Sequence, residues 1–217
     1  WRILSLPHDW SIEGDFSLDN PSTPGGGALP GGIGWYRKTF TLPETDRDKV
    51  IYVDFDGVYR NSEVWINGHS LGFRPNGYVS FRYDLTPYLR YGSQPNVIAV
   101  KADNSEQPNS RWYSGAGIYR PVTLWTAPAR HILPDGVQVR TLSIDPAEVE
   151  VTVQTTASGA VAVAILDGEQ TVATAQAESN GKAVLRVQIP NAKLWSPDSP
   201  APVSYTHLRA HETCADL

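Results

Sequence analysis

The sequence predicts an all-β protein built of two consecutive β-sandwiches. Its 217 residues include 18 Gly, 17 Pro, 7 Trp and 10 Tyr, and aromatic residues mixed with turn formers are typical of short strands joined by loops. Apolar and polar residues alternate over short segments, which is the period of a β-strand. The aromatic residues nearly vanish around residues 127–131, so we divide the chain into a first domain at 1–128 and a second domain at 129–202.

Composition and charge exclude several classes of protein. A hydrophobic content of 41% and a charged content of 19% are those of a globular protein. The net charge is −5 without any basic run, so we expect no nucleic-acid partner. No apolar stretch approaches the length of a membrane span, so we expect no membrane partner. The chain starts at Trp1 and lacks methionine; we leave its localisation open, with the periplasm or secretion favoured over the cytoplasm.

The first domain is predicted to open with a long loop and to continue as a sandwich of strands. Residues 14–34 are almost half Gly or Pro, and a loop of this length inside a compact domain is usually functional or disordered. The Asn67-Gly68 pair between two apolar runs predicts a tight hairpin, and a single helical turn is expected in 86–94. The expected strands are 35–42, 50–57, the two arms of 62–72, 78–85, 96–103 and 118–126.

The residues around the hairpin are expected to be mostly architecture. Val58, Val64 and Ile66 are predicted core residues because they are apolar and lie on or beside short strands. Trp65 and Phe73 are also expected to fill the core of the sandwich, since large aromatic side chains contribute much of a buried surface.

The second domain is predicted to be an incomplete immunoglobulin-like β-sandwich. Short strands and frequent turns, one of them at Asp167-Gly168, are typical of that fold. Such a domain has about seven strands, and only about five can be found before Pro202. The expected strands are 137–144, 147–156, the two arms of 160–177, and 182–190.

The end of the chain, PVSYTHLRAHETCADL, differs from everything before it. It carries four possible metal ligands: His207, His211, Glu212 and Cys214. Written back into codons, residues 203–213 match a transposase adapter used in sequencing libraries. We therefore interpret 203–217 as a non-native tail and predict no metal site, because zinc would also need further oriented ligands and a second shell.

Three stretches of the first domain carry a resemblance to a known family. They are LPHDW at 6–10, the segment from FDGV to DLTPYL at 55–89, and NSRWYSGAGIYRPVTL at 109–124. Together they resemble the sugar-binding domain of family 2 glycoside hydrolases, in its β-galactosidase branch. The second domain, with WSPDSP at 195–200, resembles the immunoglobulin-like module of that family. The resemblance implies a jelly-roll-like, galactose-binding-type sandwich followed by a truncated immunoglobulin-like β-sandwich.

The same resemblance implies the N-terminal, non-catalytic part of a retaining exo-β-glycosidase, a β-galactosidase of carbohydrate metabolism that hydrolyses O-glycosyl bonds. Such hydrolysis uses two carboxylates about 5–5.5 Å apart, and the family keeps both glutamates on a barrel that would follow this chain. We therefore expect no catalytic residue, no cofactor and no hydrolysis in this fragment, and we leave the cofactors of the barrel open. The expected partners of the complete enzyme are a β-galactoside-type carbohydrate and further copies of itself in a homo-oligomer.

Other functions stay open at this stage. A β-glucuronidase or β-mannosidase relative would share the fold and the pattern at 55–89. A free-standing carbohydrate-binding module or a structural sandwich without a sugar site is also compatible with a fold that carries many functions. The carboxylate pairs Glu13/Asp15 and Asp54/Asp56 have the spacing of one strand face, and we interpret them as surface charges.

A sugar offers hydroxyls and one apolar C–H face, so its site needs polar groups and an aromatic platform. The predicted loop NSRWYSGAG supplies a fork of donors, an amide and two rings, and the alternative is a loop whose arginine stacks on its own aromatic residues. The Asp of LPHDW offers acceptors for hydroxyls, or instead anchors a loop by hydrogen bonds. The family resemblance also points to the loop at 25–34. The substrate-binding candidates are Asn109, Arg111, Trp112, Tyr113 and Asp9.

Sequencing the source DNA onward from the codon of Pro202 tests the interpretation of the tail. We expect codons 203–213 to match the adapter, and the genomic DNA to continue into a strand and a barrel that carries two glutamates. Genomic codons at 203–217 followed by a stop would instead remove the enzyme interpretation and make the histidines and Cys214 ligand candidates.

Overall fold

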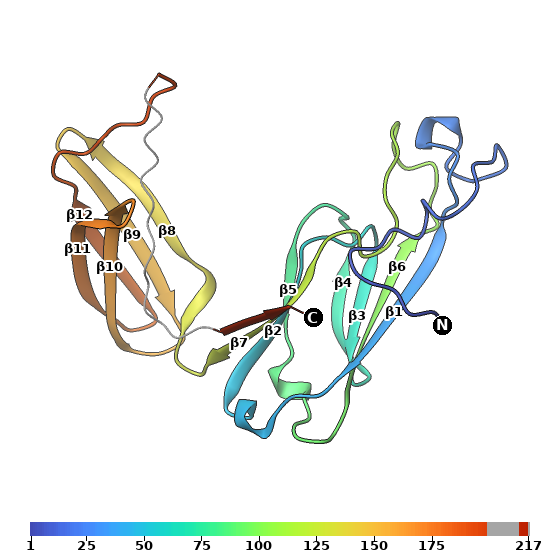
Figure 1. Ribbon diagram of the computed structural model, residues 1–217, viewed down its shortest axis with the longest axis horizontal. Helices are drawn as coiled ribbons and strands as arrows, with labels where there is room; N and C mark the ends of the chain where they lie inside the picture. The colour runs from blue at the N-terminus through green and yellow to red at the C-terminus, as the bar shows by residue number, and fades with distance from the viewer. Residues whose placement is uncertain (199–212, 217) are drawn as a thin grey trace. The chain divides into compact units, whose positions relative to one another are not determined.

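A computed structural model describes residues 1–198 and 213–216 of the chain (Figure 1). These residues form strands and three short 3₁₀ turns, without an α-helix among them, and the predicted all-β fold class is confirmed. The chain divides into two compact units, the first at 1–126 together with 213–216 and the second beginning at Ala127. The 3₁₀ turns are η1 (Pro24–Gly26), η2 (Glu44–Asp46) and η3 (Thr86–Tyr88).

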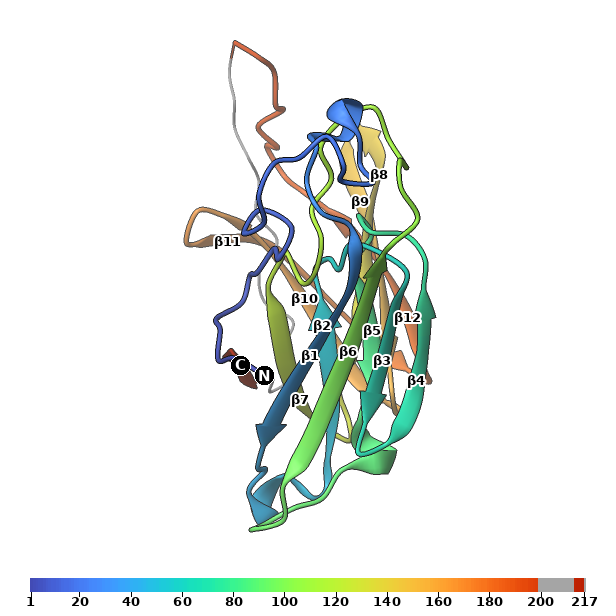
Figure 2. The same cartoon turned by 90° about the vertical axis from the view of Figure 1, so that its right-hand side faces the viewer.

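The first unit is a sandwich of two antiparallel four-stranded sheets. The strands of the first sheet lie side by side in Figure 2, in the order β1 (Gly32–Phe40), β6 (Asn96–Asn104), β3 (Ser62–Ile66) and β4 (His69–Arg74). The second sheet has the order β13 (Thr213–Asp216), β7 (Val122–Pro128), β2 (Lys49–Phe55) and β5 (Phe81–Asp84). Alternate residues of β6 are buried along its whole length, which is the period-2 pattern expected of a strand with one face on the core.

The predicted hairpin is confirmed between β3 and β4. Asn67 and Gly68 have φ of 49° and 88°, the left-handed conformation that both central residues of a tight type I′ turn need. The Asn67 side chain adds three bonds from the turn: its oxygen accepts from Val97 N at 2.9 Å, and its amide donates to Asn96 Oδ1 at 2.9 Å and to Tyr88 O at 2.8 Å. The turn therefore fixes the register of three neighbouring strands of the first sheet.

The core between the two sheets contains the residues predicted for it, with two exceptions. Val58, Val64 and Ile66 are fully buried, as predicted. Trp65 lies between Val64 and Ile66 along β3, so its side chain points to the opposite, outer face of the sheet. There it stacks on Trp35, with ring centroids 5.4 Å apart. Phe73 pairs with Glu63, also on the outer face, and is 54% exposed. The prediction that Trp65 and Phe73 fill the core is wrong, because strand alternation decides the face.

The second unit contains five strands among its described residues. A three-stranded sheet and a two-stranded sheet enclose a small aliphatic core that includes Val151, Val153, Ile165 and Leu185. Gly168 takes a φ of 62° at the predicted turn between the two strands of the smaller sheet. The three-stranded sheet has the order β12 (Lys182–Gln188), β9 (Ala147–Thr155) and β8 (Ile132–Ile144), and the other sheet consists of β10 (Gly159–Asp167) and β11 (Gln170–Ser179).

The tail interpreted as non-native lies outside the described residues except for the backbone of β13. This short strand pairs antiparallel with β7, from Thr213 opposite Thr126 to Asp216 opposite Thr123. No helix in the described part of the chain is long and apolar enough to cross a membrane.

Two neighbouring substitutions on β3 test this assignment of faces. Ile66→Ala should lower the free energy of unfolding by about 2–5 kcal/mol, because it leaves a cavity in a fully buried position. Trp65→Ala should cost only about 0.5–1.5 kcal/mol, the value of a partly exposed aromatic pair. Denaturant unfolding of both variants measures the difference, and an equal or larger loss for Trp65→Ala would contradict the assignment.

Candidate functional site

Loops from four parts of the first unit meet at one end of the first sheet, where β6 ends and β1 begins. In Figure 1 and in Figure 2, the segment before β1 and the segment after β6 lie at the same end of this sheet. Backbone hydrogen bonds join them: Tyr59 and Gly117 exchange two, at 2.9 and 2.8 Å, and Trp10 N donates to Ala116 O at 3.0 Å. We call these loops the loop cluster; it consists of residues 6–31, 59–61, 75–80 and 105–117.

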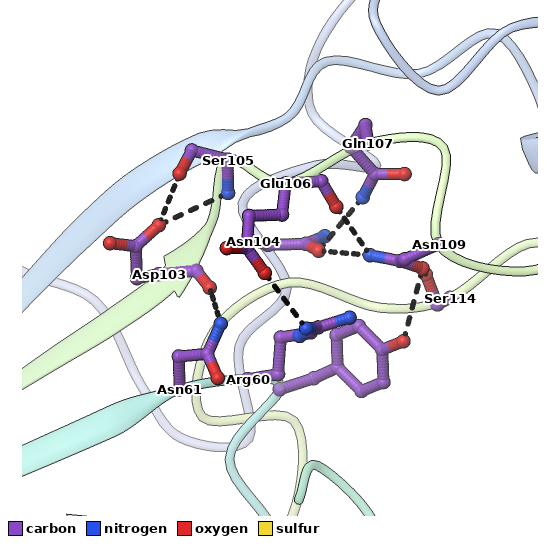
Figure 3. Close-up of polar contacts among 10 residues, drawn as sticks. Arg60, Asn61, Asp103, Asn104, Ser105, Glu106, Gln107, Asn109 and Ser114 are labelled. Carbon is purple, nitrogen blue, oxygen red and sulfur yellow. Dashed lines mark hydrogen bonds and ion pairs between the residues drawn. The ribbon is translucent and has the colours of Figure 1, made fainter. Parts of the chain in front are cut away.

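The loop cluster is organised around Asn104, the last residue of β6, which is 2% exposed. Its side-chain oxygen accepts hydrogen bonds from Gln107 Nε2 at 2.8 Å and from Asn109 Nδ2 at 2.9 Å (Figure 3). A buried amide oxygen must be satisfied inside the protein, and two donors from the following loop satisfy this one. The loop after β6 is therefore folded back onto the strand end and does not extend freely into solvent.

Asn109, a predicted substrate-binding residue, has its whole side chain engaged in this network. Its amide also donates to Glu106 O at 3.1 Å, and its oxygen accepts from Tyr59 Oη at 3.2 Å and Ser114 Oγ at 3.5 Å. Tyr59 is 6% exposed, so Asn109 connects the loop to the core. The structure therefore places Asn109 as a positioning residue of the loop.

Three charged side chains, Asp103, Arg60 and Glu106, lie on the side of this network next to β6. Asp103 accepts a hydrogen bond from the backbone N–H of Ser105 at 3.1 Å. The pKa of the Asp103 carboxyl is lowered, mainly by the hydrogen bond from the Ser105 hydroxyl. The backbone bond and Lys101 lower this pKa further, while burial opposes the shift. Arg60 forms an ion pair with Glu106 at 3.1 Å. The glutamate is largely exposed, so this pair contributes little energy and serves mainly to neutralise both charges.

Asp9 anchors the N-terminal segment to the loop after β6. One carboxylate oxygen accepts from the N–H groups of Ser11 at 2.9 Å and Ala116 at 3.1 Å, and the other accepts from the Tyr113 hydroxyl. Burial of the phenol, and then its bond to this carboxylate, raise the pKa of Tyr113. Asp9 thus matches the anchoring alternative, and Tyr113 presents only part of its ring, with its hydroxyl already bonded.

Arg111 and Trp112 are the two sequence candidates whose side chains form no hydrogen bond within the loop after β6. Trp112 is 62% exposed, and its indole N–H donates to Tyr78 Oη at 3.5 Å. The Arg111 side chain is exposed and forms no hydrogen bond, ion pair or aromatic contact within the described part of the chain. The alternative in which this arginine stacks on its own aromatic neighbours is therefore not what the structure shows.

Sequence reasoning missed three residues that build the loop cluster: Tyr59, Tyr78 and Arg60. They lie in short connections more than 25 positions before the loop they contact, and a sequence pattern does not reveal which distant loops meet at a sheet end. The signal that was available is PNGY at 75–78, a turn sequence that carries an aromatic residue.

One member of each carboxylate pair considered from the sequence forms an ion pair with a local partner. Asp54 forms an ion pair with Arg82 from the neighbouring strand, and Glu13 forms one with Arg2. The hydrogen bond from Arg2 is the main cause that lowers the pKa of Glu13, which suits a surface charge and not a proton donor. Among the described residues, no group of three or more His, Cys, Asp or Glu side chains is placed to hold a metal ion.

Comparison with known proteins identifies relatives of the whole chain. Residues 17–128 match the profile of the sugar-binding domain of glycosyl hydrolases family 2. Over its whole length, the chain is 47% identical to the β-galactosidase BoGH2A of Bacteroides ovatus, and it covers 27% of that protein. Over 92% of its length, it is 40% identical to a putative β-glucuronidase of Formosa agariphila, and it covers 20% of that protein. A crystal structure of a β-glycosidase from Bacteroides vulgatus matches all of the chain and 30% of that protein, with a TM-score of 0.82 and 38% identity. The chain thus spans about a quarter of the length of these relatives.

Asn104→Ala tests the role of the buried amide. The substitution leaves two loop donors without their acceptor, each costing about 1–3 kcal/mol if it stays buried, so amide hydrogen exchange should accelerate across 105–113. Gln107→Ala is the matched control, because it removes one donor while Asn109 still satisfies the acceptor. Equal exchange rates in the two variants would contradict the assigned role.

Proposed function

The chain belongs to family 2 of the glycoside hydrolases, and from that premise we propose that it forms the sugar-binding part of a retaining exo-β-glycosidase that acts on β-galactosides. The observation that carries this proposal is the 47% identity to a β-galactosidase along the whole chain. The match to the family's sugar-binding domain also contains most of the loop cluster, including the loop after β6. Hydrolysis of the O-glycosyl bond is proposed for the whole protein, with carbohydrate as the partner of this part.

In this proposal the loop cluster supplies binding groups on a rigid support. Arg111 offers a planar fork of donors to sugar hydroxyls, and Trp112 offers a ring to the apolar face of the sugar. Asn109, Tyr113 and Asp9 hold the loop that carries these two side chains through the bonds described above. A loop ordered before the ligand arrives loses little conformational entropy on binding, so its contacts contribute more of their energy to affinity.

A β-glucuronoside is the second candidate substrate. It is favoured by the 40% identity to a putative β-glucuronidase and by the exposed guanidinium of Arg111, since a guanidinium fork matches a carboxylate geometrically. The two candidates differ in one group of the sugar, a hydroxymethyl or a carboxylate, so a comparison of matched nitrophenyl glycosides distinguishes them.

A chimera tests the proposal and the role of Arg111 together. Residues 1–198 of this chain replace the corresponding segment of the β-galactosidase BoGH2A, and kcat and KM are measured with nitrophenyl β-galactoside and nitrophenyl β-glucuronoside. We expect an active chimera that prefers the galactoside, and an Arg111→Ala version that loses about tenfold or more in kcat/KM, the effect of one charge-assisted hydrogen bond.

Arg140→Ala, at an exposed arginine of β8 in the second unit, is the matched control and should leave both constants unchanged. The isolated chain should release no nitrophenol. Unchanged kcat and KM in the Arg111→Ala chimera would make Arg111 a structural residue, and activity of the isolated chain would refute its non-catalytic role.

A further inference from the structure

The loop between β4 and β5 is held more firmly than an exposed connection requires. Asn76 caps it, because its side-chain oxygen accepts from the N–H groups of Tyr78 at 2.8 Å and Val79 at 3.3 Å. The Tyr119 hydroxyl donates to Gly77 O at 2.8 Å, and Arg120 donates to Tyr78 O at 3.3 Å. Side chains of the loop itself and of the segment before β7 thus fix consecutive backbone groups of this turn.

Packing against Tyr59 also fixes this turn. Gly77 is buried against the ring of Tyr59, and a Cβ at this position would lie 2.2 Å from that ring, so only glycine allows the approach. The Asn61 N–H also donates to Pro75 O at 3.3 Å. The backbone of the turn is therefore positioned by the core and by the network that holds Asn109.

The one large side chain that this turn carries is nevertheless directed to solvent. Tyr78 is 51% exposed, although its ring meets Tyr59 edge to face with centroids 5.4 Å apart. Its hydroxyl accepts from the indole N–H of Trp112, which is itself 62% exposed. Two large rings from separate loops thus lie together on the surface, and burial does not account for either of them.

We propose that Tyr78, together with Trp112, forms the aromatic platform on which the apolar face of a β-linked pyranoside packs. This inference rests on the proposed sugar-binding function and adds Tyr78 to the residues of that site. The pair combines ring faces with polar atoms at their edges, which suits a ligand that has one C–H face surrounded by hydroxyls. Tyr78 takes the platform role expected of Tyr113, whose hydroxyl is bonded to Asp9.

Saturation-transfer NMR of the complete 217-residue chain with methyl β-D-galactopyranoside tests the inference. We expect a signal from the sugar's ring protons that titrates with the ligand, and an affinity about tenfold lower for Tyr78→Ala, the value of one good aromatic contact. Tyr78→Phe keeps the ring and loses only a long 3.5 Å bond, so it should retain most of the affinity.

Val79→Ala is the matched control, because Val79 lies in the same turn, is 60% exposed and contributes no ring. It should bind as the parent chain does, and the near-UV circular dichroism and melting temperature of all variants show that each is folded. Sugar binding that is unchanged in a folded Tyr78→Ala variant overturns the platform and leaves the proposed function intact. The absence of any sugar signal with the parent chain overturns both.

Discussion

The buried side-chain oxygen of Asn104 is the acceptor on which the order of the loop cluster depends. It lies at the end of the central strand β6, where the regular ladder of backbone bonds stops. Its two donors turn the chain back onto the sheet and bring Asn109 against Tyr59. Without this acceptor, the loop would lose two of the bonds that hold it in one conformation, because water satisfies the two donors equally well.

In the first unit, the sandwich provides the rigid support and the loops carry the candidate binding residues. Strand alternation buries an aliphatic and aromatic core in which Phe55 and Phe81 stack with centroids 5.0 Å apart, and that core fixes the positions of the strand ends. The loop cluster then places Arg111, Trp112 and Tyr78 in solvent on supports that are tied to those ends. Exposed binding groups on a rigid frame are the usual arrangement of a recognition site.

Much of the fold could be predicted because short-range rules decide it. The Asn67-Gly68 turn, the alternation along β6 and the Asp167-Gly168 turn all have local physical causes that one sequence contains. The placement of Trp65 and Phe73 was predicted wrongly, because their size favoured burial. The alternation of side chains along β3 puts Val64 and Ile66 on the inner face, and Trp65 and the partner of Phe73 on the outer face. Burial of a large ring in a core stabilises a fold, but only the register of its strand shows which face of the sheet the ring occupies.

The candidate site could be predicted in part for the same reason. The loop that holds Arg111 and Trp112 was visible as polar and aromatic residues between two strands, but the inward bonds of Asn109, Tyr113 and Asp9 depend on partners far along the chain. Tyr78 was missed because its role depends on its contact with Trp112, which comes from a separate loop.

The most direct test of a sugar site at this end of the sandwich is a titration of the ¹⁵N-labelled chain with methyl β-D-galactopyranoside, followed by amide chemical shifts. We expect saturable shifts confined to 59–61, 75–80 and 109–114, with the second unit unaffected. Shifts centred on the outer face of the first sheet or on the second unit, or no shifts at all, would contradict it.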